Sequence, residues 1–505
     1  MKVNTLLAIC ILLCTSCALQ KEYNILDYGA VGDGIVINTS AIQQAINECS
    51  SKGGGKVIIP KGTYLSGTIY MKDNVTIYLS KDAILKGSSS FLDYPDNKVK
   101  YKNSFSHPSN KEFGNKALLF GEGIKNIAIT GKGTIDGSGD SPEFQLGNDA
   151  TPKSRNRPSV ICFIKSSNIT IEGVRMQNSA YWMQNYLGCD GLTLKGLDIY
   201  NHSNFNQDAM DIDASNVLVE NCIIDADDDG ICLKSHDADR LVENIVIRKC
   251  TIATNCNAIK FGTKSDGGFR NIRISDCVIR KASKDYIRKW QEKLKFIELP
   301  ITVLSGLALE SVDGGNIENV HISNIQMQDV QTPIFVIMGR RNTGQAGDGK
   351  FYTSEQSPLD TTLKVGKVSN LTFKNITATS HSKITSSITA VAGYYVENVI
   401  LENIKISSMG MGTLEEARIT LPEYRGSYPE NRMYGHIYPS SGLFLRHAKN
   451  VTLNNIELEV RNDDYRPSVI LEDVHDVFIS MLKGTLPKGS MSFLKTIKCT
   501  GIKEE

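Results

Sequence analysis

The chain has 505 residues, of which 41% are hydrophobic, and its 56 Lys and Arg balance 55 Asp and Glu. This balance argues against a nucleic-acid-binding protein, which needs a basic surface. Beyond the first 20 residues, no stretch is long and apolar enough to form a transmembrane helix. The length alone would permit several ordinary domains, but a repeated sequence pattern favours one repetitive fold.

The first residues have the features of a secretion signal. MKVNTLLAICILLCTSCALQ has a lysine near its start, then a short apolar run and small residues. The segment Leu12 to Cys17 resembles a loose lipobox, which predicts that Cys17 is lipidated and becomes the mature N-terminus. Plain cleavage by signal peptidase is the alternative. We therefore expect residues 1–17 to be a signal peptide and the protein to be a secreted, periplasmic or cell-surface lipoprotein of a bacterium, with an outer-membrane lipid anchor on Cys17.

Residues 18–74 are expected to form an N-terminal cap and the first coil of the repetitive fold. The apolar residues between Ala41 and Ile46 recur at helical spacing, which predicts a helix from Thr39 to Cys49. The glycines at 53–55 end this helix, and short strands follow. A cap is needed because the first coil of a solenoid would otherwise leave the core open to water.

Residues 75–500 are expected to form one repetitive domain, because one pattern recurs along them. In each copy an Asn or Gly precedes alternating apolar and polar residues, which predicts a strand with one buried face. The copies begin at Asn74, Asn126, Asn168, Gly191, Asn216, Asn244, Asn271, Asn319, Asn370, Asn398 and Asn450. Copies that recur at the spacing of these positions, with one coil per copy, are typical of a parallel β-helix. We predict an all-β fold, a single-stranded right-handed parallel β-helix with an N-terminal helical cap.

Nine of the twelve cysteines lie after the leader. Cys222, Cys250 and Cys277 take the position that aliphatic residues hold in the other copies, so they are expected to stack in one column of the core. None of the nine shows the spacing of a zinc site. We predict that the three act as small buried hydrophobic residues and form no disulfides.

Seven aspartates crowd one stretch, from Asn206 to Ser235. They are Asp208, Asp211, Asp213, Asp225, Asp227, Asp228 and Asp229. Carboxylates this close raise one another's pKa values, so the arrangement is costly unless it is used. A solvated acidic face or a calcium site is the structural alternative.

Two motifs in this stretch resemble those of glycoside hydrolase family 28, the polygalacturonases and rhamnogalacturonases. The residues from Asn206 to Asp211 resemble the family's N-T-D-x-x-D. The run DDGICLKS, from Asp228 to Ser235, resembles its D-D-x-I-x-I-K-S. The resemblance covers nearly the whole mature chain and includes the cap of pectate-lyase-like proteins. It implies an inverting hydrolase of α-glycosidic bonds in pectic polysaccharide, at galacturonic acid or rhamnose, with no cofactor and no metal.

The resemblance also implies roles for individual residues. Asp228 is the expected general acid, and Asp208 with Asp229 is expected to position the attacking water as base. Crowding would keep Asp228 protonated near neutral pH. Aligning four strands on their apolar pairs predicts three columns on one face, which hold Asp208, Asp229 and Asn257; Asp211, Cys232, Lys260 and Ala308; and Asp213, Lys234, Gly262 and Glu310. The predicted substrate-binding residues are Asn206, Asn257, Lys260, Lys234, Glu310 and Asp211.

Two family motifs are altered in this sequence. The family's G-H-G aligns with CNA at 256–258, so the usual His is Asn257, which cannot carry a proton. The family's R-I-K, which binds the galacturonate carboxylate, aligns with ALE at 308–310, so neither cation is present. These differences argue against plain endo-polygalacturonase specificity. Lys260 is expected to supply the missing cation, or alternatively to pair with a catalytic carboxylate. Glu310 is expected either to pair with Lys234 or to contact substrate.

Two further segments are expected beside the cleft. Lys281 to Leu299 has helical spacing and many lysines, which predicts a docked helix or a lid. Tyr428 to His447 is aromatic and long enough to close one end of the cleft, which favours exo action. Two rival functions stay open, a β-helix polysaccharide lyase that uses Ca²⁺ with a Lys or Arg base, and a non-catalytic glycan-binding protein. The sequence leaves the sugar, the linkage and the oligomeric state open.

Overall fold

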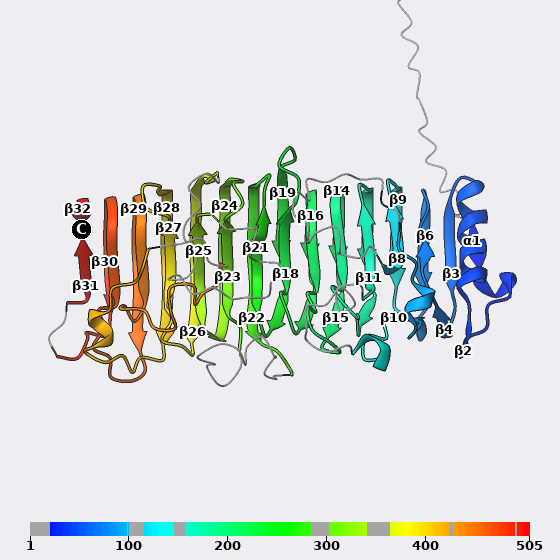
Figure 1. Ribbon diagram of the computed structural model, residues 1–505, viewed down its shortest axis with the longest axis horizontal. Helices are drawn as coiled ribbons and strands as arrows, with labels where there is room; N and C mark the ends of the chain where they lie inside the picture. Colours follow the sequence, from blue (N-terminus) through cyan, green and yellow to red (C-terminus); the bar gives the residue numbers. More distant parts are fainter. Residues whose placement is uncertain are drawn as a thin grey trace, which may run out of the picture.

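The computed structural model describes residues 21–97, 99, 116–145, 157–284, 302–340, 364–423, 429–489 and 492–505. Its strands follow one another as rungs along a single axis, with the N-terminal helix at one end and the last strands at the other (Figure 1). Strands of successive coils pair in parallel, as in β12 with β14 and β28 with β29. The predicted parallel β-helix is therefore confirmed.

The strands form three sheets that run along the axis. The site sheet contains β5 (Ile69–Tyr70), β8 (Ala117–Glu122), β11 (Ser159–Ile164), β18 (Ile231–Ser235), β21 (Asn257–Ser265), β23 (Ser305–Ser311), β25 (Thr332–Met338), β27 (Ser386–Ala390) and β31 (Leu494–Ile497). The second sheet contains β1 (Glu22–Asn24), β3 (Gly55–Ile59), β6 (Val75–Leu79), β9 (Lys125–Gly131), β12 (Ser167–Glu172), β19 (Val242–Arg248) and β32 (Thr500–Glu504). The third contains β2 (Asp33–Ile37), β4 (Gly62–Ser66), β7 (Ala83–Gly87), β10 (Thr134–Asp136), β13 (Arg175–Gln177), β15 (Asp198–Asn201), β17 (Ile223–Ala226) and β20 (Thr251–Thr254).

Longer strands bend from one sheet into the next. From the site sheet into the second run β14 (Gln184–Lys195) and β16 (Met210–Glu220). From the second sheet into the third run β22 (Phe269–Lys281), β24 (Ile317–Val330), β26 (Val368–Ser380) and β28 (Val396–Ser408). All three sheets are joined by β29 (Leu443–Val460) and β30 (Val469–Gly484).

One hydrophobic core runs through the coils from Tyr23 to Ile479. The predicted column is part of it, since Cys222, Cys250 and Cys277 are buried and Cys277 pairs with Ile325 of the next coil. All nine cysteines that the structure describes are free. Stacked apolar side chains, rather than covalent links, therefore stabilise the solenoid.

The asparagine that begins most copies has a structural role at the bend between two sheets. Asn244, Asn271 and Asn319 each adopt a positive φ, close to 58°, which Asn tolerates better than most residues. Each also donates a side-chain hydrogen bond to the Asn one coil earlier, as Asn271 does to Asn244 at 3.3 Å. The repeat in the sequence is therefore the signature of a ladder of hydrogen-bonded corners.

The cap is a helix, α1 (Thr39–Ser51), which extends two residues beyond the predicted end. It buries Ala41, Ile42, Ala45, Ile46 and Cys49 against the first coil, so it belongs to the same core as the solenoid. Short 3₁₀ helices occur at η1 (Ile25–Tyr28), η2 (Phe91–Asp93), η4 (Pro142–Phe144) and η7 (Glu416–Arg418).

Three expectations fall wholly or partly outside the described residues. They concern the signal peptide with Cys17, the insertion from residue 285 onward and the first residue of the 428–447 loop. Among the described residues, no helix has the length and hydropathy that crossing a bilayer would require. The division into leader, cap and catalytic domain remains a prediction.

Candidate active site

The outward face of the site sheet changes character along the axis. Toward the N-terminus it is apolar and buried, at Ala117, Phe120, Cys162, Ile164 and Leu187. Toward the C-terminus it is again apolar, at Ala308, Phe335, Ile337, Phe444 and Ile470, and here a loop covers it with Leu421, Met433, Tyr434 and Tyr438. The three coils between these patches, those of β16, β18 and β21, carry charged side chains on this face. Because successive coils are ~4.8 Å apart, they form a polar window about 14 Å long.

The predicted alignment of strands across this window is confirmed. Asp211 of β16 pairs with Cys232 of β18, which pairs with Lys260 of β21, which in turn pairs with Ala308 of β23. The loops that precede these strands stay in register too, because the Ala209 amide donates to the Asp229 carbonyl at 2.9 Å. Side chains far apart in the sequence are thereby brought onto one face.

Asp229 is the best-anchored carboxylate of the window. Its Oδ1 accepts hydrogen bonds from the side chain of Asn257 at 2.8 Å and from the Asn257 amide at 3.2 Å. Its Oδ2 lies 3.2 Å from Nζ of Lys260. Burial alone would raise the pKa of Asp229, but Lys260 and Lys234 outweigh it and lower the pKa to about 2. Asp229 is therefore an anion across the whole physiological range.

The pKa values of Asp208 and Asp211 are raised, whereas that of Asp229 is lowered. Burial, reinforced by Asp211, Asp228 and Asp229, raises the pKa of Asp208 well above its ordinary value. Burial also raises the pKa of Asp211 to about 6, although Lys234 lies 3.0 Å away and opposes the rise. The cluster therefore combines a fixed anion with carboxyl groups that keep a proton toward neutral pH, which is the pairing that acid–base chemistry needs.

Asp228, the expected acid, is half-buried, whereas Asp208 and Asp229 are buried. Its Oδ1 accepts from the Asp229 amide at 2.9 Å, and its carbonyl accepts from the hydroxyl of Thr254. Its carboxylate, that of Asp229 and the thiol of Cys256 lie within 4.8 Å of one another. Calcium takes six to eight oxygen ligands, and here one of three candidates is sulfur and another already contacts Lys260, so the set suits proton transfer better.

Two predictions about the lysines and Glu310 need correction. Lys234 does not pair with Glu310, because its Nζ contacts Asp211 and lies 4.7 Å from the ring of Trp182. Glu310 instead faces Lys260, at 3.9 Å. Glu310 is fully buried, and its contact with substrate stays a prediction. For Lys260, the alternative of a pair with a catalytic carboxylate is the geometry found.

The third predicted column is not a regular ladder, because the pairing of β16 with β18 ends at Ile212 and Leu233, and the register between β18 and β21 shifts after Leu233. Asp213 has other partners. Its carboxylate accepts from the His236 amide at 3.0 Å and pairs with Arg240. Burial lowers the pKa of His236 to about 3, helped by Lys234, so this imidazole is neutral.

Arg157 is a residue whose function the sequence did not indicate. It is buried, and its guanidinium donates to the carbonyls of Ala180 at 2.6 Å and Phe205 at 2.7 Å. It also reaches Oδ1 of Asn206 at 3.4 Å and lies 3.9 Å from the ring of Phe205. Arg157 thus holds the loop that carries Asn206 and Asp208. No motif spacing could have found it, because its partners are 23 to 49 residues away.

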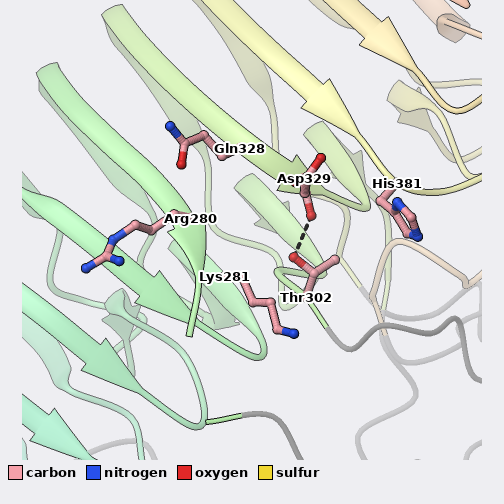
Figure 2. A pocket seen from close by; sticks show the side chains of 6 residues that line it. All are labelled: Arg280, Lys281, Thr302, Gln328, Asp329 and His381. Carbon is pink, nitrogen blue, oxygen red and sulfur yellow. Dashed lines mark hydrogen bonds between the residues drawn. The ribbon is translucent and has the colours of Figure 1, made fainter. Parts of the chain in front are cut away.

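A hollow of about 330 Å³ lies at the ends of β22 and β24 (Figure 2). It is lined by Arg280, Lys281, Thr302, Gln328, Asp329 and His381. Lys281 pairs with Thr254 of the preceding coil, and the Thr254 hydroxyl donates to the carbonyl of Asp228. Thr254 is one coil past Ala226 and Lys281 is one coil past Thr254, so the nearest lining residues lie two coils past the expected acid, and Asp329 and His381 lie further along the axis.

A parallel β-helix with carboxylates converging from adjacent coils defines a class of carbohydrate-active proteins. The sequence matches the model of glycosyl hydrolases family 28 over residues 49–288 and 307–421, which is more than half of the chain. The chain therefore belongs to glycoside hydrolase family 28, as its motifs predicted.

Named relatives agree with this assignment. The chain is 24% identical over 399 residues to an exopolygalacturonase of Zea mays, covering 77% of this chain and 84% of the relative. It is 34% identical over 169 residues to an exo-poly-alpha-D-galacturonosidase of Dickeya chrysanthemi, covering 32% of this chain and 27% of the relative. It is 29% identical over 275 residues to a probable polygalacturonase of Vitis vinifera, covering 50% of this chain and 54% of the relative.

Among solved structures, an exopolygalacturonase from Thermotoga maritima has a similar fold, with a TM-score of 0.59 and 21% identity. The match covers 77% of this chain and 87% of that structure. A family 28 exopolygalacturonase from Yersinia enterocolitica gives a TM-score of 0.58 at 19% identity, covering 96% and 78%. At these identities the likeness supports the fold alone.

Proposed function

We propose that the protein is a secreted, inverting and exo-acting glycoside hydrolase of pectic polysaccharide, which cleaves α-linked galacturonic acid or rhamnose. One observation supports this best, the convergence of aspartates from adjacent coils with one of them held as an anion. Lys260 and Asn257 help to lower the pKa of Asp229, so that its carboxylate can accept a proton, and the half-buried carboxylate of Asp228 lies close beside it. An inverting hydrolase needs one carboxylate that accepts a proton from water and one carboxylic acid that protonates the departing oxygen.

The proposed roles follow the family resemblance. Asp228 gives its proton to the glycosidic oxygen as the bond to the anomeric carbon breaks. Asp229, with Asp208 beside it, accepts a proton from the water that attacks the opposite face of the sugar. Because Asp228 is the more exposed of the three, it is suited to exchange its proton with solvent after each turnover.

Closure of one end of the window supports the exo action. Leu421, Met433, Tyr434 and Tyr438 cover the site sheet from β23 onward, one coil past Lys260. Asn431 ties this loop down, since its side chain donates to the Leu304 carbonyl at 2.8 Å. A long polysaccharide could not continue along the axis past this cover, so a chain end has to enter.

The location is proposed on the leader alone. Cys17 as a lipidated N-terminus would attach the enzyme to a membrane surface of the cell envelope. Cys17→Ala should prevent labelling with a palmitate analogue, because it removes the thiol that carries the lipid. Labelling that persists in the variant would refute the lipobox.

Product analysis tests the proposed function. The protein is incubated with homogalacturonan and with rhamnogalacturonan I and II fragments, and the products are separated by size. The proposal expects single sugars from chain ends, with no double bond. Unsaturated products that absorb in the ultraviolet and disappear with chelator would instead support the lyase. Binding without turnover would support the glycan-binding protein.

A further inference from the structure

Trp182 lies directly before β14, one coil before the aspartates of β16. The amide of the next residue, Met183, donates to the carbonyl of Asp208 at 2.9 Å. Two residues further on, Asn185 pairs with Asp211. The indole of Trp182, which is partly buried, is therefore fixed beside the loop and the strand that carry these two aspartates.

The indole ring contacts the ammonium group of Lys234, which belongs to β18, the second coil after Trp182. Nζ of Lys234 lies 4.7 Å from the centre of the Trp182 ring and 3.0 Å from Oδ1 of Asp211. Lys234 and Asp211 are both buried. The negative face of an aromatic ring attracts a cation, and the attraction is stronger where water is excluded. A carboxylate and an aromatic ring thus hold the same ammonium group.

The ring of Trp182 is itself stacked on a neighbour. The rings of Tyr181 and Trp182 have their centres 5.0 Å apart, with an angle of 21° between their planes. The guanidinium carbon of Arg157 lies 5.1 Å from the centre of the Tyr181 ring, and both residues are buried. Arg157 also donates to the carbonyl of Phe205. The ring that contacts Lys234 is therefore connected to the loop that Arg157 holds.

The position of this ammonium group affects three carboxyl groups. Burial raises the pKa of each, and the positive charge of Lys234 opposes the rise in all three, which are Asp208, Asp211 and Asp229. A lysine side chain is a point charge on a flexible stem, so it can turn from one carboxylate to another. An aromatic partner restrains the ammonium group without adding a further negative charge to the cluster.

We propose that Trp182 is a positioning residue of this site, whose indole ring, stacked on Tyr181, holds the ammonium group of Lys234 against Asp211. The inference rests on the proposed hydrolase function and adds a residue that acts on the aspartates through Lys234. A tryptophan that served as a platform for a sugar ring would change KM instead. Kinetics therefore separate the two roles.

Trp182→Leu should lower kcat about 10-fold and leave KM nearly unchanged, because a desolvated contact between a cation and a ring is lost. Trp182→Phe, which keeps a ring, should recover part of this loss. Tyr78→Leu is the matched control, because Tyr78 of β6 also contacts a lysine, with Nζ of Lys56 5.2 Å from its ring. This control should keep the kcat of wild type. A rise in KM with an unchanged kcat in Trp182→Leu would overturn the proposal and assign Trp182 to the sugar.

Fluorinated tryptophans test the π system while keeping the shape of the side chain. Each added fluorine withdraws electron density from the ring, so its attraction for a cation weakens while its packing changes little. The chain has two tryptophans, so the label is confined to Trp182 in a Trp290→Phe background. In this background kcat should fall stepwise as fluorines are added. A kcat that does not depend on the number of fluorines would overturn the proposal.

Fluorescence gives a measurement that needs no turnover. Protonation of Asp211 removes the carboxylate that Lys234 contacts, so the ammonium group should move relative to the ring of Trp182. Burial raises the pKa of Asp211 to about 6, and the fluorescence of Trp182 in the Trp290→Phe background should therefore change around pH 6. The other carboxyl groups that act on Asp211 include Asp228 and Asp229. Lys234→Met should abolish the change.

This titration distinguishes failure of the inference from failure of the hydrolase function. If the fluorescence change is absent, or persists in Lys234→Met, the inference is overturned whether or not a glycan is cleaved. If the change occurs, depends on Lys234 and no pectic substrate is cleaved, the contact is supported and the hydrolase function is refuted.

Discussion

Nζ of Lys260 lies 3.2 Å from Oδ2 of Asp229, and this contact joins two coils of the solenoid at the centre of the candidate site. The lysine stands where a cation for substrate was expected, yet its nearest carboxylate belongs to the protein. The contact is the main reason that Asp229 stays ionised despite its burial. Lys260 therefore sets the protonation state of the site.

Lys260→Met should lower kcat/KM by a similar factor on uronate substrates and on their reduced counterparts, by about 10²-fold. Without the cation, the pKa of Asp229 should rise, so the acidic limb of the pH–rate profile should move to higher pH. The profile is measured on one substrate of each kind. A loss confined to uronates, with an unmoved acidic limb, would mean that Lys260 binds substrate instead.

Asp208→Asn should abolish turnover and stabilise the fold. The raised pKa of Asp208 means that the folded chain holds a proton that the unfolded chain loses above a pKa of about 3.9. Its contribution to stability therefore declines as the pH rises above about 4. Removing the charge should raise the free energy of unfolding at pH 7 by about 1–2 kcal/mol, with less gain near pH 4.

Chemical denaturation of both proteins at the two pH values measures this difference. Asp229→Asn is the matched control, because its lowered pKa predicts the opposite sign. Asp229 contributes stability above a pH of about 4, and this contribution is lost as the pH falls toward 2. If wild type and Asp208→Asn had the same free energy of unfolding at pH 7, the raised pKa assigned to Asp208 would be contradicted.

Arg157→Lys should reduce kcat with a smaller effect on KM. Lysine keeps the charge but cannot reach the carbonyls of Ala180 and Phe205 and the side chain of Asn206 together, as the planar guanidinium does. Loosening the loop should misplace Asp208, at a cost of about 10²-fold in rate. Steady-state kinetics with a thermal unfolding control separates this effect from global destabilisation. Full activity of Arg157→Lys would show that the fork geometry is not needed.

Asn431→Ala should release the covering loop. Its side chain donates to the Leu304 carbonyl and also lies within hydrogen-bond distance of Gln331 and Thr332, so the variant loses hydrogen bonds that hold the loop on the solenoid, each worth about 0.5–1.5 kcal/mol. The variant should lose single-sugar release relative to internal cleavage, as shown by size analysis of products from a long pectic chain. Asn398→Ala, an exposed member of the corner ladder, provides the control. If the loop is loosened in Asn431→Ala but the products are unchanged, the covering loop does not cause exo action.

The sequence predicted the column positions of the site correctly but missed several of the side-chain partners. Alternating apolar residues determine how successive strands align, so the sequence alone places Asp211, Cys232, Lys260 and Ala308 in one column. Which ion pairs form depends on the conformations of the long side chains, and the apolar periodicity of the sequence does not determine these conformations. Lys234 contacts Asp211 instead of Glu310, and Asp213 pairs with Arg240 beyond the end of the β16–β18 pairing.

Contacts between residues that lie many coils apart could also not be predicted from the sequence. Asn431 reaches a carbonyl 127 residues earlier, and the apolar face that its loop covers has the same residue types as the core. The length and composition of the loop suggested that it covers the cleft. Which strands it packs against could not be predicted, because this depends on tertiary packing. Arg157 is similar, since its role comes from the rings of Tyr181 and Phe205 and from two carbonyls on later coils.

The most direct test of the account is the configuration of the first sugar released, followed by proton NMR with wild type and Asp228→Asn. The substrate is an oligosaccharide of the rhamnogalacturonan backbone that carries α linkages. The account predicts that wild type releases the β anomer first and that Asp228→Asn, still folded, releases neither anomer at a measurable rate. Release of the α anomer, or near-normal turnover by Asp228→Asn, would contradict it.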